Sequence, residues 1–367
     1  MKPLPMLRNY VRAVAFTVLS AVAGGLQAQD LVFTLADFVP MWTNPSLTGA
    51  YSGTARVGGL YRDQSRGFNV DAFQTPTFYV DAPLIYVGKK KKSWLGVGGM
   101  VISDTKGAAS LSDTYLEGGV ALHRIFNERR KSRSVFSVGL RGGVLQRAAD
   151  LENRALVLAE EQDIGLGGGG LGVGSGLDRQ LDPNASGVDI ALGVSLARTI
   201  DEDRNFRIGL TAQHLTVPDV ALTRQEYTRS LTYGAQAQYR QLIGDQYLFE
   251  PAMFAQFTSS VATAQVQASL GTYLGIEKDK LLKVGLGFRA PRQAYTLVGF
   301  EVGDLKIAAA FDIYTGGPQS VTQGFANNPD APVNSKLFNS AFELGLAYII
   351  KIYKEPKVSP VILCPQI

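Results

Sequence analysis

The chain has 367 residues, 19% charged and 46% hydrophobic, and its 36 basic and 32 acidic residues give a net charge of +4. Removing Lys2, Arg8 and Arg12, which lie in a predicted targeting signal, leaves 33 basic residues against 32 acidic ones. This balance lacks the basic excess expected for nucleic-acid binding. The single cysteine excludes an internal disulfide and a cysteine-rich metal cluster.

The first residues have the pattern of a secretory signal. Three basic residues precede the apolar stretch Ala13–Val22, and small residues then lead to Ala28. The stretch is shorter than the roughly 20 apolar residues that a membrane-spanning helix needs. We therefore predict that residues 1–28 are a signal peptide, cleaved before Gln29.

Residues 29–53 form a predicted N-terminal segment outside the repeating part of the chain. Leu31–Gly49 contains three large aromatic residues, Phe33, Phe38 and Trp42. We expect this segment either to plug the lumen of the barrel predicted below or to lie beneath it in the periplasm.

From Thr54 onward the chain divides into about fourteen segments of about ten residues, separated by polar turns. The predicted strands are Thr54–Arg62, Phe73–Asp81, Trp94–Ser103, Thr114–Arg124, Ser134–Gln146, Gly187–Ala197, Phe206–Leu215, Ser230–Arg240, Tyr247–Phe257, Thr263–Gly275, Leu281–Ala290, Ala294–Val302, Leu305–Tyr314 and Ser340–Lys351.

The alternation within these segments predicts β-strands. In Ser230–Arg240, for example, Tyr233 and Ala235 face one way, while Gln236 and Gln238 face the other. The segment length matches the ~9–11 residues of a transmembrane strand. An even strand number and abundant glycine favour an all-β fold, a transmembrane antiparallel up-and-down β-barrel over residues 54–351 with a C-terminal periplasmic tail at 352–367. The alternative is a secreted soluble β-protein.

Aromatic residues at segment ends also favour a membrane barrel, in which such residues form girdles at the two interfaces. They are Tyr61, Tyr79, Trp94, Tyr115, Tyr247, Tyr314 and Tyr348.

Loop lengths predict the orientation. The longest connections lie between Gln146 and Gly187, from Thr216 to Arg229, and from Thr315 to Asn339. Outer-membrane barrels have short periplasmic turns and longer outer loops. We therefore expect an outer-membrane location with both termini in the periplasm.

The chain offers little for catalysis, cofactors or metals. Only two histidines occur, His123 near a predicted periplasmic strand end and His214 near an outer one. The glycine-rich run Gly165–Gly176 follows no parallel strand and opens no helix, so it does not predict nucleotide binding. We expect no enzyme activity, no cofactor and no metal site.

Two basic turns and the tail fall on the predicted periplasmic side. The basic turns contain Lys89, Lys90, Lys91 and Lys92, and Arg129 and Arg130. One interpretation is solvated turns near anionic lipid headgroups, and the other is a docking surface for a periplasmic partner. In the tail, Lys354, Cys364, Pro365 and Ile367 complete the candidate docking residues.

Several stretches, in order along nearly the whole mature chain, resemble motifs of the PorP/SprF family. Thr43–Gly49 is similar to an early Asn-Pro-Ala…Gly segment, with Ser46 in place of Ala. The other stretches are Tyr61–Gln64 (a Tyr-Arg-Asn/Asp-Gln signature), Val80–Leu84 (an Asp-x-Pro turn), Gly96–Gly107 (a hairpin), Gly209–Pro218 (a Gly-Leu-Ser-x-x-His-Leu-x-x-Pro stretch) and Cys364–Ile367 (a Cys-Pro-Arg-aromatic tail). At the tail, Gln366 and Ile367 depart from the family pattern.

The resemblance implies a fourteen-stranded barrel without an enzymatic site that works with type IX secretion and gliding motility. Its implied partners are outer-membrane lipid, periplasmic peptidoglycan-associated and type IX components, and cargo adhesins. His214 would then be structural. Two alternatives remain: a transport barrel for apolar solutes, like fatty-acid transporters, and a diffusion porin.

Overall fold

The computed structural model describes eleven stretches of the chain: residues 31–64, 73–87, 92–106, 111–128, 132–149, 184–222, 227–259, 262–275, 279–290, 293–314 and 340–352. The predicted signal peptide and the predicted tail beyond Ile352 lie outside these residues.

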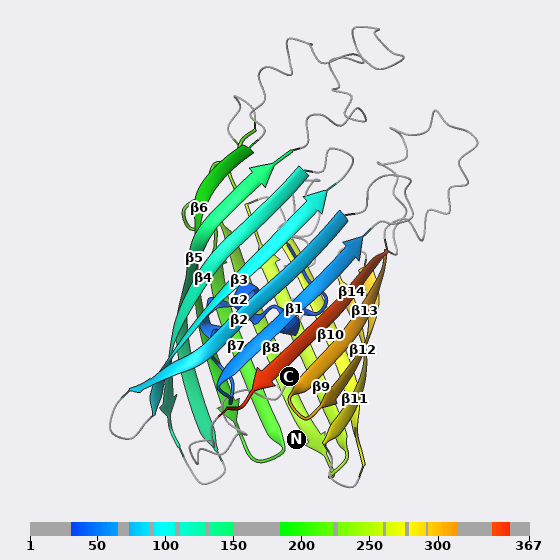
Figure 1. Ribbon diagram of the computed structural model, residues 1–367. Helices are drawn as coiled ribbons and strands as arrows, with labels where there is room; N and C mark the ends of the chain where they lie inside the picture. The colour runs from blue at the N-terminus through cyan, green and yellow to red at the C-terminus, as the bar shows by residue number, and fades with distance from the viewer. Residues whose placement is uncertain are drawn as a thin grey trace, which may run out of the picture.

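Fourteen antiparallel strands form one closed barrel (Figure 1), which confirms the predicted fold class. The strands are β1 (Ala55–Gln64), β2 (Phe73–Val87), β3 (Ser93–Lys106), β4 (Leu111–Phe126), β5 (Arg133–Ala148), β6 (Asn184–Thr199), β7 (Arg204–Gln213), β8 (Thr232–Ile243), β9 (Tyr247–Phe257), β10 (Ala262–Leu274), β11 (Lys280–Arg289), β12 (Gln293–Val302), β13 (Leu305–Tyr314) and β14 (Ala341–Ile350). Each strand pairs with its sequence neighbour, and β1 pairs with β14 to close the ring, from Ala55↔Ile350 to Gln64↔Ala341. We call this pairing the seam. Closure gives every strand two partners, because a bilayer cannot satisfy an open sheet edge.

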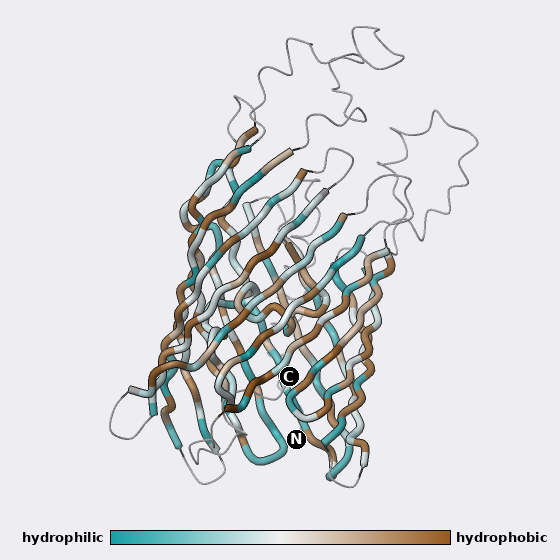
Figure 2. The backbone as a smooth tube through the Cα atoms, viewed as in Figure 1, coloured by the Kyte–Doolittle hydropathy of each residue, from teal (hydrophilic) through white to brown (hydrophobic). Residues whose placement is uncertain are grey.

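Side chains alternate between the two faces of each strand, and this alternation determines which of them contact lipid. Along β4, Leu116, Val120 and Leu122 are exposed on the outer face, while Glu117 and His123, at the alternating positions, are buried in the lumen. Figure 2 shows the same alternation of apolar and polar residues along the strands. In β8, Tyr233 is exposed and Gln236 is buried, as the sequence predicts.

The aromatic girdle prediction is wrong for three residues. Tyr79, Trp94 and Tyr115 are each at most 1% exposed and face the lumen. Tyr247 and Tyr348 do lie on the outer face. Alternation separates the two faces of a strand, but an aromatic ring suits either the lipid interface or a packed interior.

The predicted Asp-x-Pro turn at Val80–Leu84 is also wrong, because β2 runs through it. The pairing of β2 with β3 shifts register between Pro83 and Ile85, which marks a β-bulge or similar irregularity. Such an irregularity accommodates a proline, which cannot donate a ladder hydrogen bond. The strand therefore continues to Val87, six residues beyond the predicted end.

The barrel has two different rims. We call the end where β1 begins and β14 ends the terminal rim, and the opposite end the loop rim. The terminal rim carries tight connections such as Gly244–Gln246 and Gly303–Asp304. Strands β2 to β6 have 14 to 16 residues and β7 to β14 have 10 to 13, so one side of the barrel is taller (Figure 1).

Three short helical turns precede β1 and lie inside the barrel (Figure 1): η1 (Ala36–Phe38), α2 (Pro40–Thr43) and η2 (Pro45–Leu47). We call residues 31–53 the plug. Pro40 and Pro45 each stand at a first helical position, where the missing N–H costs nothing. Among the described residues no helix has the length and apolar character needed to cross a membrane.

We predict that Val284→Arg, in the middle of the lipid-exposed face of β11, destabilises the barrel. An arginine at the bilayer midplane costs ~2–4 kcal/mol, whereas one near an interface costs ~0–1 kcal/mol. The matched control is Ile352→Arg, because Ile352 is exposed just beyond β14. Urea unfolding in lipid vesicles measures both, and equal losses for the two variants would contradict the assigned membrane face.

Candidate functional site: the plugged lumen

The predicted docking residues fall mostly outside the described part of the chain. Lys89, Lys90, Lys91, Arg129, Arg130, Lys354, Cys364, Pro365 and Ile367 all lie there. Lys92 is described, and its Nζ lies 2.9 Å from Glu128 Oε2. Glu128 Oε1 also accepts from Arg133 Nη2 at 2.5 Å, so the described ends of the β2–β3 and β4–β5 connections are joined by ion pairs at the terminal rim. The hydrogen bond from Lys92 holds the pKa of Glu128 below its usual range.

The plug is centred on Asn44, Pro45 and Ser46. Asn44 Oδ1 accepts the N–H of Ser46 at 2.9 Å, which caps η2. The amide of Asn44 donates to the carbonyl oxygens of Val194 and Leu210 at 3.2 Å. The plug is therefore hydrogen-bonded directly to the barrel wall at β6 and β7.

The plug turns toward β1 at Gly49, whose φ of +66° suits glycine. Its N–H donates to Asp81 Oδ2 at 2.7 Å, and its carbonyl accepts from Trp94 Nε1 at 2.9 Å. Asp81 also binds Arg56 through two hydrogen bonds of 2.9 and 2.7 Å. A buried ion pair thus fixes the point where the plug joins the wall.

His123 supports the same corner and has a structural role. Its Nε2 lies 2.8 Å from the carbonyl oxygen of Thr48, and its Nδ1 lies 2.8 Å from Ser137 Oγ. The ring stacks on Trp94 with centroids 4.6 Å apart. The imidazole is fully buried and held on both nitrogens, so it is not positioned as a catalytic base.

Arg141 anchors α2 at the middle of the lumen. Its Nη1 donates to the carbonyl oxygens of Met41 and Trp42 at 3.0 and 3.1 Å, at the end of α2 where carbonyls lack helical partners. Its Nε lies 2.8 Å from Glu117 Oε2, and both side chains are fully buried. The guanidinium also lies over the Trp42 ring at 4.6 Å, a cation–π contact.

A third group of charges holds the plug near the loop rim. Glu343 accepts the N–H groups of Thr34 and Leu35 at 2.9 and 2.8 Å. The Thr34 hydroxyl donates to Asp312, which also binds Arg289 at 3.1 Å. Bonds from carboxylates to backbone N–H groups are among the stronger hydrogen bonds in proteins.

An inward-folded segment covers part of the plug from the loop side. We call residues 214–222 and 227–231 the inward loop. His214 has a φ of +59°, and its Nδ1 lies 2.9 Å from Asp189 Oδ2. Arg229 binds Asp113, and Val220 is completely buried against the hydrophobic core. His214 is therefore a structural residue at the loop-rim end of β7.

The described residues line two cavities between the plug and the wall. The terminal-side cavity has about 810 Å³ of space, counting the part open to solvent, and is lined by residues 34–38 and the inner faces of β8 to β13. The loop-side cavity has about 530 Å³ on the same basis and is lined by the start of the plug and β7 to β10.

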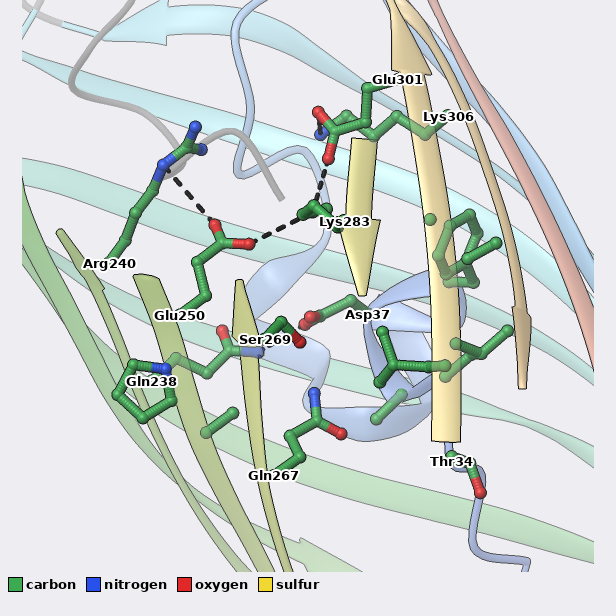
Figure 3. Close-up of a pocket in the computed structure, with 18 of the residues that line it drawn as sticks. Thr34, Asp37, Gln238, Arg240, Glu250, Gln267, Ser269, Lys283, Glu301 and Lys306 are labelled. Atoms are coloured by element: carbon green, nitrogen blue, oxygen red, sulfur yellow. Dashed lines mark hydrogen bonds and ion pairs between the residues drawn. The ribbon is translucent and has the colours of Figure 1, made fainter. Parts of the chain in front are cut away.

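A chain of ion pairs lines the terminal-side cavity (Figure 3). Lys283 lies between two carboxylates, 3.2 Å from Glu250 and 2.5 Å from Glu301. Arg240 pairs with Glu250 at 3.5 Å, and Lys306 with Glu301 at 4.0 Å. The cations and anions neutralise one another, so the cavity has no strong excess charge.

The described residues contain no group of three or more His, Cys, Asp or Glu side chains arranged to hold a metal ion. The wall and plug residues that build the lumen were not identified as site residues from the sequence. The sequence feature that could have identified them is the set of short motifs around Asn44, Asp81 and His214. These motifs come together only in the closed barrel.

The family model described as type IX secretion system membrane protein PorP/SprF matches residues 26–327 of the chain. No curated protein matches it.

Solved structures with a similar fold include three barrels. The toluene transporter TbuX of Ralstonia pickettii is 12% identical, with 90% of this chain and 96% of that chain covered and a TM-score of 0.47. The toluene transporter TodX of Pseudomonas putida is 11% identical, with 89% and 95% covered and a TM-score of 0.45. The CymD monoaromatic hydrocarbon channel is 9% identical, with 92% and 98% covered and a TM-score of 0.47.

We predict that Arg141→Met lowers the free energy of unfolding by ~3–5 kcal/mol, because Glu117 would stay buried without its partner. The double variant Arg141→Met/Glu117→Gln removes both charges and should recover much of this loss. Urea unfolding followed by tryptophan fluorescence measures both variants. A double variant no more stable than the single one would show that the ion pair is not what anchors α2.

We also predict that Gly139→Ala loosens the plug. A Cβ at Gly139 would lie 2.3 Å from the carbonyl group of Pro45, so η2 would have to shift, at a cost of ~1–3 kcal/mol. Gly142→Ala in the same strand is the control, because its Cβ would meet nothing closer than 3.5 Å. Limited proteolysis within residues 31–53 should be faster for Gly139→Ala alone.

Proposed function

Because the chain belongs to the PorP/SprF family of type IX secretion system membrane proteins, we propose that it is an accessory scaffold of that apparatus in the outer membrane. In this function the barrel holds periplasmic, peptidoglycan-associated and type IX components at one rim. It supports secretion or surface attachment of cargo adhesins at the other. No covalent chemistry is involved.

The filled lumen is the observation that carries this proposal. Residues 33–51 are almost all buried, and the plug is bonded to the wall by Asp81, Arg141 and Glu343. A general diffusion porin needs a wide aqueous lumen. A barrel filled by its own chain instead suits a rigid body whose rims are its working surfaces.

The terminal rim supports docking in the periplasm. Short turns are on the periplasmic side of bacterial outer-membrane barrels, and the tight connections lie on this rim. The pair between Lys92 and Glu128 joins the described ends of the two connections that carry the basic residues. Basic residues in these connections would steer an acidic partner surface toward this rim.

Transport of apolar solutes is the second candidate. It needs a continuous apolar path, but η1 lies between the two cavities, and ion pairs line the cavity on the terminal side. These features favour scaffolding over apolar transport as the conclusion.

The test is an affinity pull-down of the tagged barrel from gently solubilised outer membranes, with mass spectrometry of the co-purifying proteins. We expect type IX or peptidoglycan-binding proteins with the wild type. Changing Lys89, Lys90, Lys91 and Lys92 to Gln, together with truncation after Ile352, should reduce their recovery by about tenfold, equivalent to about 1.4 kcal/mol of binding free energy. The Lys92–Glu128 pair is exposed, so its loss costs only ~0–1 kcal/mol of stability.

Lys106→Gln, at the loop-rim end of β3, is the control and should leave recovery unchanged. A wild-type barrel that purifies alone, carrying fatty acid or another apolar ligand, would reject the scaffold and support transport.

A further inference from the structure

The two cavities lie end to end on one stretch of wall. Along each of β8, β9 and β10, residues that line the loop-side cavity are followed directly by residues that line the terminal-side cavity. The register places lumen-facing residues of the three strands in rows across the wall. From the loop rim down, the rows are Gly234–Gln256–Thr263, Gln236–Phe254–Gln265 and Gln238–Ala252–Gln267, and below them Arg240 forms an ion pair with Glu250, which is paired with Ser269.

The barrier between the cavities is thin. Ala36 of η1 lines both cavities. On this side η1 is held by Asp37, whose Oδ1 accepts from Gln238 Nε2 at 2.6 Å and lies 3.4 Å from Arg207 Nη2 (Figure 3 shows Asp37 and Gln238). The plug's larger contacts are with other strands, since η2 packs on β4, β5 and β6.

The amide of Gln236, beside the loop-side cavity, makes no hydrogen bond to the described residues. Gln236 is 7% exposed and lines the loop-side cavity, and neither its amide nitrogen nor its amide oxygen has a hydrogen-bond partner among the described residues. A buried amide without partners is destabilising, because its desolvation is not repaid by hydrogen bonds. The amide keeps two N–H donors and an acceptor oxygen just beneath the cavity surface, and a solute that enters gains their hydrogen bonds when the Gln236 side chain turns into the cavity.

The side chains that line the two cavities disfavour a charged solute. The loop-side cavity is lined by amides, hydroxyls and apolar groups and by no charged side chain. At the terminal side, Lys283 is already paired with Glu250 and Glu301, so a free ion gains little there. An uncharged solute with hydroxyl or amide groups can instead exchange hydrogen bonds with the successive glutamines, at no cost in ion desolvation.

We propose that η1 and the β8–β10 wall enclose a narrow passage for small uncharged solutes that carry hydroxyl or amide groups, with its constriction at Ala36. The solute moves from the Gln236 row to the Gln238 row past the Ala36 methyl group. This permeation is separate from scaffolding, because it uses the lumen rather than the rims.

The test uses the full-length barrel in proteoliposomes, with swelling rates in urea and glycerol. We expect wild-type vesicles to swell faster than protein-free ones. Ala36→Phe should slow this protein-dependent swelling by about tenfold or more, because a phenyl ring would fill the space left in an otherwise close-packed lumen. Ala221→Phe, the same change in the inward loop outside both cavities, should leave the rate unchanged.

Heat-modifiable migration on gels checks that each variant is folded. If Ala36→Phe does not fold, Gln236→Leu replaces it: removing an amide that has no partner should leave folding intact and slow urea and glycerol severalfold. Wild-type vesicles that swell no faster than protein-free ones would overturn the proposal. So would folded variants at Ala36 and Gln236 that swell like the wild type, or an Ala221→Phe variant slowed as much as Ala36→Phe.

Discussion

A closed wall of fourteen strands turns half of its side chains toward a lumen, and in this protein many of those side chains are charged. A buried charge is tolerated only when a partner and further hydrogen bonds surround it. Asp81, Glu117 and Glu343 each pair with an arginine of a neighbouring strand on the inner face of the wall, and each pair also contacts the plug. The plug and the inner wall are therefore parts of one polar network, and neither is complete alone.

The family motifs gain a common explanation from this network. Asn44 and Pro45 form the centre of the plug. Asp81 accepts the N–H of Gly49 at the end of the plug, and Arg62 donates to the carbonyl oxygen of Val32 near its start. The stretch ending in Pro218 instead builds the inward loop, which lies over the plug. Motifs that lie far apart in the sequence thus contact the plug or the wall around it. Together they build the filled lumen rather than separate turns.

All fourteen strands were predictable because alternation has a period of two, and β9 and β13 agree to the residue. The sequence could not decide whether the N-terminal segment fills the lumen or lies beneath it. Its helical turns η1, α2 and η2 have three or four residues each, too few to show a periodic pattern. Aromatic residues such as Trp94 and Tyr115 were misassigned because their chemistry suits both faces. The site was harder still: Gln236 and Gln265 share a row only through the register of β8, β9 and β10.

The seam has a consequence for the order of assembly. Arg62 and Glu343 stand directly opposite each other across β1 and β14, and Glu343 also accepts two N–H groups of the plug. The first and last strands are thus joined by the ladder and also by the chain that precedes β1. The plug cannot gain these bonds before β14 arrives, and β14 cannot bury Glu343 at low cost before the plug is in place. Ring closure and filling of the lumen are therefore coupled: each stabilises the other, and the plug completes its hydrogen bonds to Glu343 only when the last strand is paired with the first.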